Sequence, residues 1–235
     1  MPDPISIEKN LAHIKDLIAL YEKKYGREPG SVKLLAASKH QPLTKLQAAF
    51  LAGQTVFGES YLQEALEKIA VLPPAAEWHF IGPIQRNKTR KIAQHFSWIH
   101  SVDNEIVVQR LSEQRPANLP DLNICIQLNI SQEQSKSGVM LSEAFQLLSF
   151  ASQLPRLKVR GLMAIPAPAA TFATQRQVFH QIQLEFKRLK TQIHTLDTLS
   201  MGMSDDFEAA IAEGSTIVRI GTAIFGERQI QKSSI

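Results

Sequence analysis

The chain has 235 residues, 44% apolar and 20% charged, a balance typical of a globular protein with a full core rather than of a fibrous or disordered chain. Lysine and arginine together exceed aspartate and glutamate by four, a surplus too small to indicate nucleic-acid binding. The single cysteine, Cys125, excludes an internal disulfide and favours a cytoplasmic location, and we find no signal-peptide pattern and no apolar run long enough for a membrane span.

The predicted elements begin with a helix over residues 5–25, where apolar side chains from Ile7 to Tyr21 have helical spacing and Gly26 ends the pattern. Short strands and helices then alternate. We expect strands at residues 32–39, 55–60, 78–82, 98–102, 123–130, 158–165, 198–201 and 216–221. The expected helices lie at residues 44–52, 62–70, 87–94, 105–114, 142–153, 171–193 and 205–212.

Eight short strands, mostly separated by one helix, predict a parallel (β/α)8 barrel with an additional N-terminal helix. We expect residues 1–235 to form this barrel as a single domain. An open, doubly wound sheet would show the same alternation, but no glycine-rich dinucleotide fingerprint follows the first strand.

Lys39 ends the first expected strand. If the strand continues to this residue, Leu35, Ala37 and Lys39 share one face, and the amine lies above two apolar side chains. Such an amine loses solvation and can act as a neutral nucleophile. The alternative is a strand-end lysine in solvent, which is the commoner situation for this residue type.

The loops after the seventh and eighth strands of a (β/α)8 barrel often bind phosphate. After the seventh strand, we expect Ser204 to cap the next helix, whose free amides can hold an anion. After the eighth strand, Gly221 exposes its backbone and Thr222 adds a hydroxyl. The two loops together predict a phosphate site, although an ordinary capped helix is the alternative for the first loop.

Arg219 lies within the last apolar strand. A buried arginine must be paired or must face a ligand, and a closed barrel has no exposed edge, so we expect its guanidinium to project into the barrel mouth. An amine, a guanidinium and a phosphate site together match pyridoxal 5'-phosphate (PLP), which carries an aldehyde, a ring nitrogen and a phosphate.

Seven segments of the sequence carry a more specific signal. They are residues 37–39, 57–64, 78–82, 135–138, 161–163, 200–206 and 218–226. In this order the segments, which extend over essentially the whole chain, resemble the pyridoxal-phosphate homeostasis protein family, related in fold to the barrel domain of alanine racemase. The resemblance implies that the protein binds PLP and stores or delivers it within the cell.

The resemblance also implies roles for individual residues. Lys39 forms the covalent aldimine, Arg219 faces the pyridine nitrogen, and the phosphate is held by Ser204, Gly221 and Thr222. Ser60 stands where family members usually have asparagine, so it offers the cofactor ring a hydroxyl and no amide. His79 matches the family and either packs beside the ring or belongs to the strand core.

We expect binding without catalysis. A permanently charged arginine opposes protonation of the pyridine nitrogen, which electron-sink chemistry needs. Enzymes similar to alanine racemase take a tyrosine from a second domain, and this chain stops at Ile235, shortly after the barrel. A PLP-dependent racemase or lyase is the alternative.

The remaining expectations concern partners. PLP-dependent apo-enzymes are candidate recipients of the cofactor, and we expect a monomer without nucleic-acid or membrane partners. The basic run at residues 86–91 lacks interleaved aromatic residues and indicates a solvated helix face. His95 and His100 have no third ligand nearby in the sequence, so no metal site is expected.

Overall fold

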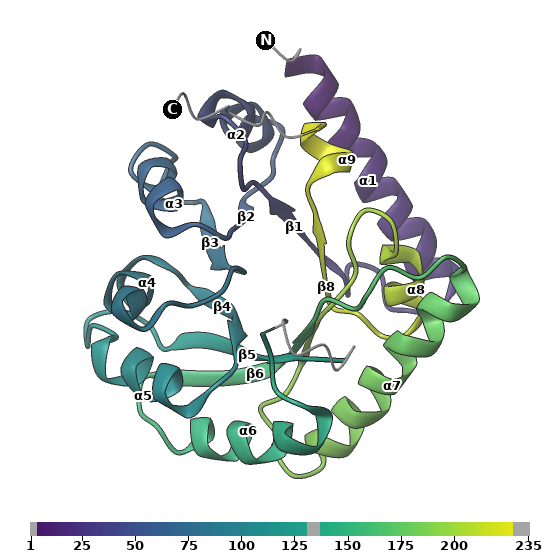
Figure 1. Ribbon diagram of the computed structural model, residues 1–235. Coiled ribbons are helices and arrows are strands. Elements are labelled where there is room, and N and C mark those ends of the chain that lie inside the picture. Colours follow the sequence, from purple (N-terminus) through teal and green to yellow (C-terminus); the bar gives the residue numbers. More distant parts are fainter. Residues whose placement is uncertain (1–3, 131–136, 228–235) are drawn as a thin grey trace, which may run out of the picture.

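The computed structural model describes residues 4–130 and 137–227, so Ser135 and Lys136 of the segment 135–138 lie outside the described residues. Eight parallel strands form a closed barrel in chain order, with β8 pairing with β1 (Figure 1). The strands are β1 (Lys33–Ala37), β2 (Val56–Glu59), β3 (Glu77–Phe80), β4 (Trp98–Val102), β5 (Leu122–Leu128), β6 (Leu157–Ala164), β7 (Thr198–Ser200) and β8 (Ile217–Ile220). The predicted (β/α)8 barrel is confirmed.

Helices surround the barrel (Figure 1). They are α1 (Pro4–Lys24), α2 (Leu43–Leu51), α3 (Leu62–Ile69), α4 (Thr89–His95), α5 (Glu105–Gln114), α6 (Ala144–Ser152), α7 (Phe172–Lys190), α8 (Phe207–Ala212) and α9 (Thr222–Phe225), with short 3-10 helices η1 (Arg86–Lys88) and η2 (Leu141–Glu143). The one-turn helix α9 was not predicted. Within the described ranges, none of the helices combines the length and hydropathy needed to cross a membrane.

The additional N-terminal helix α1 packs against α2, α8 and α9. Its buried side chains include Ile7, Leu11, Ile14 and Ile18, which recur at the spacing of one helix face. The helix therefore covers the outside of the barrel where β8 meets β1, the seam that closes the sheet (Figure 1).

Cys125 lies in β5, as predicted, and is fully buried with Trp98 and Met163. Burial raises the pKa of its thiol to about 12. The thiol therefore stays protonated and contributes to packing rather than to chemistry.

Candidate functional site

A cavity of about 240 Å³ opens at the carboxyl end of the barrel strands. Its lining contains six of the seven predicted site residues: Lys39, Ser60, Ser204, Arg219, Gly221 and Thr222. These residues come from opposite ends of the chain, and the pairing of β1 with β8, which sets Leu35 beside Arg219, brings them together. The barrel mouth is where enzymes of this fold place their chemistry.

A second cavity of about 320 Å³ adjoins the first. The two share Lys39, Ser60, Ile81 and Ile165, and the second also reaches Tyr61, Gln127 and Asn129. Lys39 therefore lies at the border between two spaces.

A larger cavity, of about 360 Å³, lies elsewhere, between α1 and the amino ends of β1 and β2. Its one carboxylate, Glu22, already accepts hydrogen bonds from the backbone amides of Gly30 and Val32, at 2.9 and 2.7 Å. That engagement, and its distance from the loops at the strand ends, make it a poor candidate for the functional site.

The position of Lys39 is set by a turn and not by the strand. β1 ends at Ala37, two residues earlier than expected, and the amide of Gln41 donates to the carbonyl of Ser38 at 3.1 Å. His40 has the left-handed φ of 59°, which reverses the backbone direction just after Lys39. The argument from strand alternation was therefore wrong in its cause, although Ala37 and Lys39 do line the same cavity.

A buried charge cluster lies next to this turn. The Lys68 amine donates to Glu59 Oε1 at 2.7 Å, to Glu64 Oε1 at 2.6 Å and to the backbone carbonyl of Ser38 at 2.7 Å. The Ser38 hydroxyl donates to the same oxygen of Glu59 at 2.6 Å. Burial raises the pKa of Glu59, while the adjacent Lys68 ammonium acts in the opposite direction.

The cluster fixes both neighbours of Lys39. It holds Ser38 through its carbonyl and hydroxyl, and it holds the amide of His40, which donates to Glu64 Oε1 at 2.7 Å. Sequence reasoning gave Glu59 and Glu64 no role, although both lie in the segment 57–64. The signal that was missed is the spacing of Glu64 and Lys68, four residues apart on one helix.

Arg219 is 4% exposed and points into the barrel mouth, as predicted. Its Nη1 donates to the carbonyl and the hydroxyl of Ser200, at 2.6 and 2.7 Å, and its Nη2 donates to the carbonyl of Ala164 at 2.9 Å. Burial lowers the pKa of the guanidinium to about 10, and the carboxylate of Asp206 opposes that shift. The group therefore stays charged at neutral pH.

The loop after β7 differs from the prediction. Helix α8 begins at Phe207, and its N-cap residue is Asp206 rather than Ser204. The carboxylate of Asp206 accepts a hydrogen bond from the amide of Met203 at 2.6 Å, and this bond shapes the loop ahead of the helix. Ser204 is half-buried and lines the cavity without serving as the cap.

The loop after β8 brings backbone amides to the cavity. Gly221 passes so close to β1 that a Cβ there would lie 2.9 Å from the carbonyl oxygen of Ala37. Thr222 starts helix α9, and the first amides of a helix have no acceptor within it. Exposed amides, the Thr222 hydroxyl and the nearby Arg219 charge suit a phosphate, while Asp205 and Asp206 on the facing loop act against one.

His79 is not among the residues that line the cavity. It lies on β3, inside the barrel, fully buried, with Nε2 2.6 Å from Glu77 Oε1 and Nδ1 2.8 Å from His100 Nε2. Its position favours the strand-core alternative over packing beside the cofactor ring.

Two further features are the basic run at residues 86–91 and the arrangement of side chains that could ligate a metal. Arg86, Asn87, Lys88, Arg90 and Lys91 of the basic run are exposed, as on a solvated face. Across the described part of the chain, no group of three or more His, Cys, Asp or Glu side chains is arranged to hold a metal ion.

Comparisons with known proteins place the sequence and the fold in a family. The family model of the alanine racemase N-terminal domain matches residues 8–229. The chain is 50% identical to the pyridoxal phosphate homeostasis protein of Escherichia coli K12 over 230 residues, covering 96% of this chain and 98% of that protein. It is 52% identical to the protein of the same name from Pseudomonas aeruginosa over 224 residues, covering 95% of this chain and 96% of that protein.

Among solved structures, PipY of Synechococcus elongatus with PLP bound has a TM-score of 0.81 and 35% identity, covering 94% of this chain and 100% of that one. The identities are far above what a shared barrel alone would produce, and they extend over almost the whole length of each protein. The chain therefore belongs to the pyridoxal phosphate homeostasis protein family.

Proposed function

We propose that this protein binds PLP in the cavity at the barrel mouth and serves its homeostasis by storing or delivering it, without catalysing a reaction. The observation that carries the proposal is the gathering of Lys39, Arg219 and the two loops after β7 and β8 around one cavity. The PLP-bound structure of PipY and the names of the relatives support it. A single domain, a monomeric state, a cytoplasmic location and transfer to PLP-dependent apo-enzymes remain predictions from the sequence.

In this proposal Lys39 is the point of covalent attachment. Its neutral amine attacks the aldehyde carbon, a C=N bond forms, and the aldehyde oxygen leaves as water. Ser38 and His40, held on either side by the charge cluster, keep the amine at the border of the two cavities. The attachment involves no oxidation or reduction. Hydrolysis of the C=N bond by water reverses it when the cofactor is delivered.

The other residues bind the non-reacting parts of the cofactor. Ser204, Gly221 and Thr222 offer hydroxyls and backbone amides to the phosphate. Arg219 faces the ring nitrogen, and its fixed positive charge disfavours protonation there. Ser60 is 9% exposed and lines both cavities, where its hydroxyl is available to the ring.

A racemase or lyase activity is the second candidate. It is favoured by Tyr61, which lines the second cavity together with Lys39, because racemisation needs an acid/base group on each side of the substrate. Turnover of a panel of D- and L-amino acids by the PLP-loaded protein would favour the enzyme, and bound cofactor without turnover favours the carrier.

Borohydride reduction followed by peptide mass analysis tests the attachment. We expect the pyridoxyl adduct on Lys39, and Lys39→Ala should lose both the adduct and the absorption band of the linked cofactor. The matched control is Lys158→Ala, which removes an exposed amine near the amino end of β6. An adduct found mainly on Lys33 or Lys45 would contradict the assignment.

A further inference from the structure

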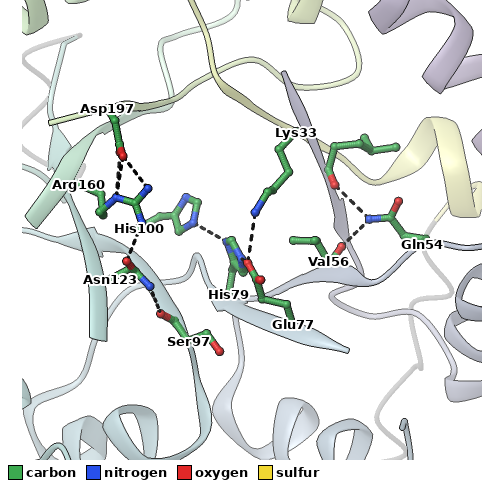
Figure 2. A network of polar contacts seen from close by, with 11 residues as sticks. Lys33, Gln54, Val56, Glu77, His79, Ser97, His100, Asn123, Arg160 and Asp197 are labelled. Atoms are coloured by element: carbon green, nitrogen blue, oxygen red, sulfur yellow. Dashed lines mark hydrogen bonds and ion pairs between the residues drawn. The ribbon is translucent and has the colours of Figure 1, made fainter. Parts of the chain in front are cut away.

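A chain of hydrogen-bonded side chains passes through the barrel interior and ends at Arg219. From Glu77, the contacts run to His79 at 2.6 Å, from His79 to His100 at 2.8 Å, and from His100 Nδ1 to Ser200 Oγ at 2.7 Å. Ser200 Oγ in turn lies 2.7 Å from Arg219 Nη1. Figure 2 shows the part of the chain that joins His100, His79 and Glu77.

The two ends of the chain fix the direction of its hydrogen bonds. The hydrogen bond from His79 lowers the pKa of Glu77 to about 2, so this carboxylate only accepts and His79 Nε2 must donate. At the other end, Arg219 only donates, so Ser200 Oγ accepts from it and keeps its own hydrogen for His100 Nδ1, which accepts in a neutral ring whose Nε2 donates. His100 then donates through Nε2 to His79 Nδ1.

This arrangement uses every donor and acceptor of the two rings, and both are neutral Nε2–H tautomers. All hydrogen bonds point from Arg219 toward Glu77, so each strengthens the next. If His79 were protonated, both of its ring nitrogens would donate, so His100 would have to accept at Nε2 and donate through Nδ1. The Ser200 hydroxyl would then lose its acceptor. Desolvation also disfavours a charge here, since burial is the main factor that lowers the pKa of both histidines.

Charged groups on several elements surround this series of hydrogen-bonded side chains and affect its protonation. Besides Glu77, they are Lys33 on β1, Arg219 on β8, the Arg160–Asp197 ion pair on β6 and before β7, and Asp206 ahead of α8. Arg160 lies over the Trp98 ring at 4.6 Å, and that ring stacks on His79. The cations Lys33 and Arg219 both disfavour a further positive charge on His100.

We propose that His79 and His100 are positioning residues for the guanidinium of Arg219, which they orient through the Ser200 hydroxyl. The proposal rests on the proposed function, in which Arg219 faces the ring nitrogen of PLP. Of the five N–H hydrogens of an arginine, the three bonds to Ser200 and Ala164 use three. The hydrogen-bonded side chains set the orientation of the guanidinium, and this orientation decides whether its remaining hydrogens, on Nε and Nη2, point into the cavity.

The tautomers can be measured without any cofactor. In the apo-protein labelled with ¹⁵N-histidine, long-range ¹H–¹⁵N spectra should show two of the seven histidines as neutral Nε2–H tautomers that do not titrate between about pH 6 and about pH 8. Ser200→Ala should shift the Nδ1 resonance of His100, which assigns it. An imidazolium or an Nδ1–H tautomer at His100 would overturn the proposal, whether or not the protein binds PLP.

The effect on the cofactor is tested with Ser200→Ala, which breaks the chain by one hydroxyl. We expect PLP binding to weaken about fivefold and the absorption spectrum of the bound cofactor to change its pH dependence. The matched control is Ser112→Ala on α5, which removes an equally buried hydroxyl that donates to the carbonyl of Pro155. It should leave both quantities unchanged.

The variant His79→Phe tests whether His79 acts on PLP binding through Ser200. If His79 acts through Ser200, its replacement weakens PLP binding in the wild-type background and adds nothing further in Ser200→Ala. A drop in melting temperature with unaltered affinity and spectrum in both variants would show a structural role only and would overturn the proposal. Failure of wild-type protein to form the Lys39 adduct would instead reject the proposed function. The tautomer measurement would still show whether the hydrogen bonds between Arg219 and Glu77 have the proposed direction.

Discussion

The two sides of the cavity are held in place by different means. On the Lys39 side, buried charged side chains hold the backbone, because Lys68, Glu59 and Glu64 clasp the residues before and after the amine. On the Ser204 side, the backbone itself sets the shape, through Gly202 at a φ of 97° and Gly221 against β1. The first side should therefore be sensitive to loss of charge, and the second to gain of volume.

The largest effect is expected from Lys68→Met. The side chain of Lys68 is 5% exposed and that of Glu59 is fully buried, so the substitution leaves a buried carboxylate without its cation. We expect a loss of about 3–5 kcal/mol in the free energy of unfolding, measured by urea denaturation. The double variant Glu59→Leu/Lys68→Met should recover part of that loss.

The control for this prediction is Arg188→Met, which breaks an exposed ion pair with Glu185 on α7. Exposed pairs contribute little, so stability should hardly change. If Lys68→Met were as mild as Arg188→Met, charge would not be what fixes the Lys39 side.

Gly202→Ala tests the other side by adding one methyl group. A Cβ at Gly202 would lie 2.6 Å from the Cβ of Ala210, and its φ of 97° disfavours any side chain. We expect a loss of about 2–4 kcal/mol in unfolding free energy, from backbone strain and overpacking together. Gly26→Ala, at a φ of 62° with no atom within 4 Å of the added Cβ, should cost only about 1 kcal/mol.

Comparison of PLP with pyridoxal sharpens the role of the Ser204 side. If its hydroxyls and amides hold the phosphate, pyridoxal should bind at least about tenfold more weakly, a difference of about 1.4 kcal/mol. Fluorescence titration of Lys39→Ala should show the same preference, because Lys39 is not one of the groups proposed to bind the phosphate. Equal affinity for the two compounds would reject the phosphate site.

The smallest expected effect is on the pH dependence of stability, through Glu77, which lies at the opposite end from Arg219 in the series of hydrogen-bonded side chains. The pKa of Glu77 falls from 4.5 to about 2 on folding, so the stabilisation it provides is complete above about pH 4.5 and is lost as the pH falls toward 2. The side chain is 36% exposed, which keeps the effect small. Urea denaturation between those pH values should show a flatter pH dependence for Glu77→Gln than for wild type.

Glu105→Gln, at an exposed position on α5, is the control and should follow the wild-type curve. A Glu77→Gln curve that also coincides with wild type would mean that the contact with His79 does not lower the pKa of Glu77.

The alternation of eight short apolar strands with amphipathic helices predicted a parallel α/β fold, because each element type has its own period of buried side chains. The absence of a glycine-rich fingerprint after the first strand then favoured the barrel over an open sheet. Six of the seven predicted site residues line one cavity, since parallel strands bring all their carboxyl ends to one mouth. Errors occurred at two loops, where hydrogen bonds between residues three positions apart set the local geometry. The turn after Ala37 and the cap at Asp206 depend on hydrogen bonds that a strand or capping pattern does not contain.

Pairings between distant residues were decided only by the tertiary structure. His100 meets Ser200, a hundred positions away in the chain, and Lys68 reaches Ser38 across thirty. Nothing in either local sequence indicates such a partner, because a polar side chain on a buried strand face has many candidate neighbours until the barrel closes. Closure selects one neighbour for each, and burial then requires that their hydrogen bonds be satisfied.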